Sequence, residues 1–125
     1  MKYIITLFFI LLSFKITAQE IITGTRDIQP KSELVKTFPA HEDDILLIEI
    51  EKIEGKKLGK ITVANAEDEI IYMRYDVKDL KKKIIIKEAG TYTLRVENDG
   101  KKNFKCSISV ILTDKEKKKR TVINT

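Results

Sequence analysis

Residues 91–97 read TYTLRVE, a strict alternation of polar and apolar side chains. Successive side chains of a β-strand point to opposite faces of a sheet, so Tyr92, Leu94 and Val96 are expected on one face and the polar residues on the other. The NDG sequence at residues 98–100 is typical of a tight hairpin, because Asp-Gly tolerates positive φ angles. These residues predict a half-buried antiparallel strand that leads through a hairpin into another strand.

The same period of two extends through much of the chain. Apolar residues alternate over 104–112, where only Ile111 breaks the phase, and over 44–53, and they continue at 61–63 after an interruption at 55–59. Further predicted strands are 20–25, 32–38, 70–75 and 84–86, with a turn at 65–68 and a charged connection at 77–83. Residues 70–75 are apolar on both faces, so their buried face is left open.

Turn residues separate these segments at intervals of roughly 8 to 12 positions, which is typical of sandwiches and barrels. We therefore predict an all-β fold, an antiparallel, jelly-roll-like β-sandwich of seven or eight strands. A chain of 125 residues has room for one such domain, which we place at residues 19–113. The basic segment 114–125 is expected to be a disordered tail.

The first eighteen residues have the order of a signal peptide. They begin with a lysine at position 2, continue through an apolar run over residues 3–12, and end at Ala18. Cleavage there removes two basic residues and no acid, which lowers the net charge from +5 to +3. We predict an exported protein, periplasmic or secreted, that has no membrane span after cleavage.

The residues available for chemistry are few. His41 is the only histidine, and we find no sequence motif for a nucleophile, a metal site or a phosphate-binding loop. Cys106 is the only cysteine and alternates with apolar neighbours, so it reads as a buried hydrophobic residue. We therefore predict no enzyme, no catalytic residue, no cofactor and no metal ligand, and the mild net charge argues against a nucleic-acid partner.

Two acidic loops form a candidate ligand site, whose residues are His41, Glu42, Asp43 and Asp68. The alternative interpretation is that these are ordinary solvated turns. Calcium takes six to eight oxygen ligands, so the loops would bind this ion only if they met at one end of the sandwich.

A second candidate site consists of apolar residues out of phase with the predicted core, namely Ile45, Leu47, Ile85 and Ile111. Clustered on a sheet, these side chains would mark a dimer face or a patch that binds a partner.

The "Gly-x-Tyr, alternating strand, Asn" pattern at residues 90–98 resembles two known kinds of small sandwich. These are the GOLD-like (emp24-type) domains and the bacterial pre-peptidase C-terminal domain. The order of a strand at 45–50, a strand at 61–63, a polar turn and a strand at 70–72 adds to the resemblance, which covers about residues 33–113. It implies a non-catalytic accessory sandwich of an exported bacterial protein.

The function we predict is an exported, non-catalytic interaction or accessory module that binds an envelope or extracellular component, protein or glycan. One alternative is a carbohydrate-binding module that uses Tyr72 and Tyr75. Another is that the chain forms the amino-terminal accessory domain of a longer exported protein.

Overall fold

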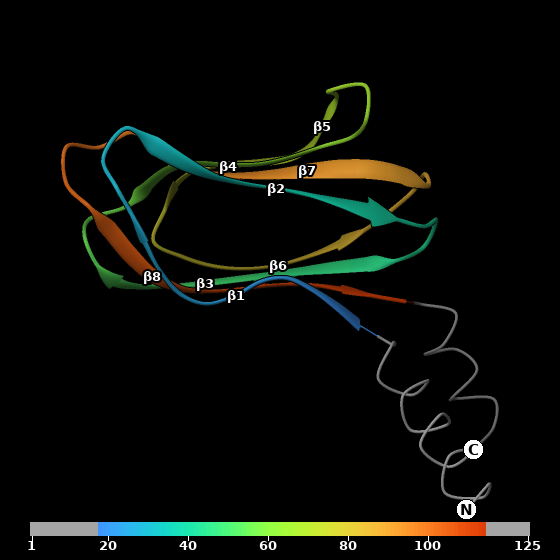
Figure 1. Ribbon diagram of the computed structural model, residues 1–125, viewed down its shortest axis with the longest axis horizontal. Helices are drawn as coiled ribbons and strands as arrows, with labels where there is room; N and C mark the ends of the chain where they lie inside the picture. Colours follow the sequence, from blue (N-terminus) through green and yellow to red (C-terminus); the bar gives the residue numbers. More distant parts are fainter. Residues whose placement is uncertain (1–17, 115–125) are drawn as a thin grey trace, which may run out of the picture.

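Two antiparallel sheets pack face to face in the computed structural model, which describes residues 18–114 (Figure 1). The strands are β1 (Ala18–Ile28), β2 (Ser32–Ala40), β3 (Ile45–Glu54), β4 (Leu58–Ala64), β5 (Ile70–Val77), β6 (Asp79–Ile85), β7 (Gly90–Asn98) and β8 (Phe104–Thr113). Residues 1–17 of the predicted signal peptide and residues 115–125 of the predicted basic tail lie outside the described residues. Among residues 18–114 there is no helix that could cross a membrane.

Each sheet has four strands. The first sheet has the order β1-β8-β3-β6 and the second the order β2-β7-β4-β5. Only β4 and β5 are consecutive in the chain and paired with each other, so every other connection described crosses from one sheet to the other (Figure 1). The predicted antiparallel β-sandwich is confirmed, with eight strands in the described part of the chain.

The core lies between the sheets and follows the predicted alternation. Tyr92, Leu94 and Val96 of β7 are buried, and so are the predicted inward residues of β3 and β8. The strands predicted at 20–25 and 32–38 are also present, as the longer strands β1 and β2. Burial of each large apolar side chain contributes about 1.5–3 kcal/mol, which makes this cluster the main source of stability.

The connection predicted as a hairpin at Asn98 is a crossing. β7 pairs with β2 and β4 in the second sheet, whereas β8 pairs with β1 and β3 in the first. The turn therefore carries the chain between layers, and the prediction of a hairpin was wrong. The positive-φ chemistry of Asp-Gly is shared by many turns, so it does not distinguish a hairpin from a crossing.

The charged segment predicted as a connection at 77–83 contains most of strand β6, and that prediction was also wrong. β6 pairs with β3 at the edge of the first sheet, and Leu80 and Ile84 pack against the core. Lys82 occupies the inward position between them, and its Nζ lies 5.5 Å from the centre of the Tyr72 ring. The aliphatic stem of a lysine can lie along an apolar layer while its charge reaches water. A charged residue at an inward position therefore hid the alternation of polar and apolar residues along β6.

The unassigned phase of residues 70–75 has its cause in a β-bulge. Val63 pairs with Tyr72 but Ala64 pairs with Ile70, so Ile71 is an extra residue in β5. Tyr72 then shares the inner face with Val63, while Met73 lies on the outer face with Thr62. β5 is an edge strand, which explains why apolar residues on both of its sides remain partly exposed.

Candidate functional site

Three loops meet at one end of the sandwich, at the right in Figure 1. They are residues 41–44 between β2 and β3, 65–69 between β4 and β5, and 86–89 between β6 and β7. Two backbone hydrogen bonds join the first loop to the third: the amide of Asp43 donates to the carbonyl of Ile86 (2.7 Å), and the amide of Ile86 donates to the carbonyl of Asp44 (2.8 Å).

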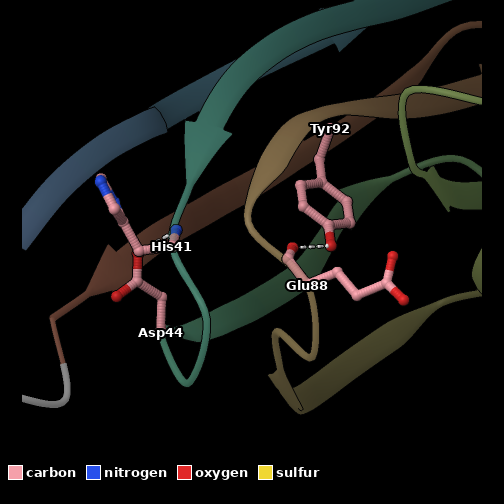
Figure 2. Close-up of polar contacts among 4 residues, drawn as sticks. All are labelled: His41, Asp44, Glu88 and Tyr92. Atoms are coloured by element: carbon pink, nitrogen blue, oxygen red, sulfur yellow. Dashed lines mark hydrogen bonds and ion pairs between the residues drawn. The ribbon is translucent and has the colours of Figure 1, made fainter.

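Asp44 holds the 41–44 turn together. Its Oδ2 accepts a hydrogen bond from the backbone amide of His41 (2.9 Å), and its own amide donates to the His41 carbonyl (3.1 Å). The imidazole of His41 is 87% exposed and points away from Tyr92 (Figure 2). Glu42 and Asp43 are exposed as well. The buried carboxylate of Asp44 therefore stabilises the turn. The predicted ligand residues His41, Glu42 and Asp43 lie on the solvent-exposed side of the loop.

Asp68 lies in a separate turn that Asn65 organises. The Oδ1 atom of Asn65 accepts hydrogen bonds from the amides of Glu67 (3.0 Å) and Glu69 (2.9 Å). Asp68 has a φ of 61° and donates its amide to the Asn65 carbonyl (3.1 Å). Within residues 18–114, no three histidine, cysteine, aspartate or glutamate side chains come together as a group that could hold a metal ion.

A pocket of about 410 Å³ opens at this end, between the edge strands of the two sheets. It is lined by Asn65, Glu69, Ile71, Ile84, Ile85, Lys87, Glu88 and Tyr92. The hydroxyl of Tyr92 donates a hydrogen bond to the carbonyl of Glu88 (2.5 Å; Figure 2), and burial raises the pKa of this phenol. The neutral, hydrogen-bonded tyrosine fixes the 86–89 loop against β7 and gives the pocket a rigid wall.

The predicted partner residues lie on the outer face of the first sheet near the same end. The register places Leu47 beside Ile111 and diagonal to Ile85. Leu47 is 38% exposed and Ile85 is 53% exposed, while Ile111 is half-buried. We call these three residues the apolar patch. Ile85 also lines the pocket, so the patch and the pocket form one continuous surface.

Ile45 does not belong to this surface, and the expectation that it is exposed was wrong. It lies between Ile85 on β6 and Thr113 on β8 and is only 8% exposed. Its neighbours on both sides leave it little contact with solvent, which period-two reasoning on one strand alone does not reveal.

The two tyrosines of the carbohydrate alternative lie on opposite faces of β5. Tyr72 is half-buried against the core, whereas Tyr75 pairs with Lys60 on the outer face and is 58% exposed. The two rings therefore do not form a single platform on which a sugar could stack.

Sequence reasoning missed the pocket itself. Its lining combines Ile71, Ile84 and Tyr92 from three different strands with the 65–69 and 86–89 loops. The one usable signal was the apolar character of residues 70–75 on both faces, which marks a strand with exposed apolar side chains at an edge.

No protein-family model and no curated protein matches the sequence. Solved structures do share the fold. The pre-peptidase C-terminal domain of a collagenase from Bacillus anthracis is 15% identical, with a TM-score of 0.55 over 71% of this chain and 89% of that one. PliG of Aeromonas hydrophila, a periplasmic inhibitor of g-type lysozyme, is 12% identical, with a TM-score of 0.55 over 78% of this chain and 87% of that one. The Yersinia pseudotuberculosis-derived mitogen is 14% identical, with a TM-score of 0.54 over 72% of this chain and 83% of that one.

At these identities the likeness concerns the fold alone. It supports the resemblance to the pre-peptidase C-terminal domain at the level of architecture, and it gives no support to the GOLD-like half of that resemblance. The chain is thus a β-sandwich of the kind that these bacterial domains also adopt.

Proposed function

We propose that the protein is an exported, non-catalytic interaction module that binds an envelope or extracellular protein through the apolar patch and the adjoining pocket. The observation that carries this proposal is the position of Ile85, which is 53% exposed and belongs to both surfaces. The signal peptide at residues 1–18 and delivery to the periplasm or the exterior are part of the same proposal.

The energetics favour an apolar contact at this place. Leu47 and Ile85 keep a third to a half of their surface in water. Covering that surface with a partner stabilises the complex by about 1 kcal/mol for each side chain, from the usual value for full burial. The pocket beside them offers space for an anchoring side chain, and Lys87 and Glu88 on its rim can orient the partner through polar contacts.

A binding role without catalysis also agrees with the positions of the polar side chains in the 41–44 loop. The carboxylate of Asp44 accepts a hydrogen bond from the backbone amide of His41 and so stabilises the turn, while the imidazole of His41 lies in solvent. One structure with the same architecture is a periplasmic lysozyme inhibitor, which supports the idea that such a sandwich can act by binding another protein.

Site-specific photo-cross-linking tests the proposal in cells that express the full chain. A photoreactive residue at Leu47 is expected to give a discrete cross-linked protein, whereas the same residue at Glu51 is expected to give none. Glu51 is a matched control because it lies on the outer face of the same strand, towards the other end.

Ile85→Glu should abolish the cross-link at Leu47 while the domain remains folded, because about half of this side chain already faces solvent. Equal labelling at both positions, or a cross-link that survives Ile85→Glu, would contradict the proposed surface.

A further inference from the structure

Two turns at the opposite end of the sandwich, at the left in Figure 1, line a second pocket, which has a volume of about 590 Å³. These turns cross between the sheets: residues 55–57 connect β3 to β4, and residues 99–103 connect β7 to β8. Phe104, which begins β8 and is almost fully buried, lies at the base of the pocket. A pocket of this size accepts a ligand as large as a sugar.

Four lysines dominate the lining of this pocket. Lys56 and Lys57 come from one turn and Lys101 and Lys102 from the other, with Asp99 as the single acid. The lining thus carries an excess of three positive charges. Among residues 18–114, Lys57 alone of the four lysines forms an ion pair.

The partner of Lys57 is Asp76, at 3.2 Å, and both side chains are more than half exposed. An exposed pair of this kind is weak and exchanges readily with a competing anion. The carboxylate of Asp99, the one acid of the lining, packs against Gly59 in β4. The other three lysines concentrate positive charge on the pocket.

Asn98 gives the β7–β8 turn a fixed shape. The side chain is 2% exposed, and its Nδ2 donates to the carbonyls of Ile28 (2.9 Å) and Lys102 (2.8 Å). Its Oδ1 accepts a hydrogen bond from the amide of Gly100 (3.0 Å). These bonds tie the loop that carries Lys101 to the end of β1 and to itself.

The facing turn is held by close contact between backbones. Gly55 has a φ of 103°, and a Cβ atom there would lie 2.9 Å from the carbonyl oxygen of Asn103 and 3.2 Å from the Cα of Phe104. The β3–β4 turn therefore rests directly on the residues that lead into β8. Both lysine pairs stand on rigid supports on the two sides of one pocket.

We infer that this pocket binds a small ligand that carries two or more phosphate or sulfate groups. Ammonium groups bind such oxyanions as compact point charges, and a cluster of like charges is relieved when an anion enters. Because lysines stand on both turns, a ligand with two anionic groups can contact both sides at once. The lysine stems and Phe104 add an apolar surface for the body of the ligand.

Isothermal titration calorimetry with fructose 1,6-bisphosphate, inorganic pyrophosphate and glucose tests the inference on protein purified after expression of the full chain. Saturable binding of the bisphosphate is expected in about 20 mM salt and should weaken as the salt concentration rises, because ions screen exposed charges. Glucose should not bind. Lys56→Gln combined with Lys101→Gln should weaken bisphosphate binding by about tenfold or more.

The matched control is Lys81→Gln combined with Lys83→Gln, which lowers the net charge equally from exposed positions on β6. Compared in about 0.1 M salt, this control should change the affinity by less than about twofold, since charges more than about 10 Å away are then largely screened. Amide chemical shifts should move at Gly55 and Gly100 on titration. Pyrophosphate binding as tight as that of the bisphosphate would support the site and assign it to free oxyanions, whereas tighter binding of the bisphosphate would assign it to a phosphorylated sugar.

No saturable binding of either anion would overturn the inference. So would an equal loss of affinity in the β6 control, because that result would reduce the effect to the overall charge of the protein.

Discussion

Asn98→Ala is the most informative single change that the structure suggests. It removes three hydrogen bonds and leaves the carbonyls of Ile28 and Lys102 and the amide of Gly100 without this partner. Each such bond contributes about 1 kcal/mol, and burial without a partner adds to the loss. Because Asn98 is 2% exposed, water replaces these bonds poorly, and we expect the free energy of unfolding to fall by about 3 kcal/mol.

Urea unfolding measures this loss. With an m-value of about 1.5 kcal/mol/M for a domain of this size, the midpoint should fall by about 2 M. Asn103→Ala is the control, because this side chain is exposed in the same turn and its replacement should cost less than about 0.5 kcal/mol. A midpoint for Asn98→Ala as high as that of the control would refute the claim that Asn98 holds the β7–β8 turn in place. It would also remove the argument that the pocket lined by the four lysines, which we call the basic pocket, is rigid.

Other predictions concern the core, the 41–44 loop and the response to pH. Leu94→Ala should lower the free energy of unfolding by about 2–5 kcal/mol, since this side chain is fully buried, and an unchanged urea midpoint would contradict the strand phase. His41→Ala should leave the melting temperature nearly unchanged while Asp44→Ala lowers stability by about 1–2 kcal/mol, and the reverse order would contradict the assigned roles. Burial raises the pKa of Cys106 and of Tyr92 above their ordinary values of 9.0 and 10.0, so the folded state keeps protons that the unfolded state loses. Stability measured by urea should therefore fall as the pH rises above about 9, and less steeply in Cys106→Ala; a flat profile would contradict the burial of these groups.

The core of the fold was predictable because its signal is local. Alternation on β7 and β8 identifies the buried residues correctly from Tyr92 to Leu112, since a strand that covers a core on one face must repeat every second residue. The same reasoning failed at β6 because Lys82 takes an inward position. It could not assign the buried face of β5, because the extra residue Ile71 shifts the alternation of inward and outward side chains.

The sites were less predictable because they depend on which strands become neighbours. Leu47 and Ile111 are far apart in the chain, and only the pairing of β3 with β8 sets them side by side. The exposure of Ile45 was misjudged for the same reason, because its neighbours on β6 and β8 cover it. Residue pattern thus identified candidate side chains, and strand order decided which of them share a surface.

The basic pocket is the clearest case of a site that topology creates. Lys56 and Lys101 belong to separate turns, and in a simple hairpin after Asn98 the second turn would stay within one sheet. The crossing from β7 to β8 instead brings it to the gap between the sheets, where the β3–β4 turn also crosses. Asn98 is the residue that makes this crossing rigid, because its buried amide bonds to the end of β1 and to its own loop. If Asn98→Ala loosens the turn without unfolding the sandwich, oxyanion binding should weaken although every lysine remains. This result would show that the affinity depends on where the lysines are held and not only on how many there are.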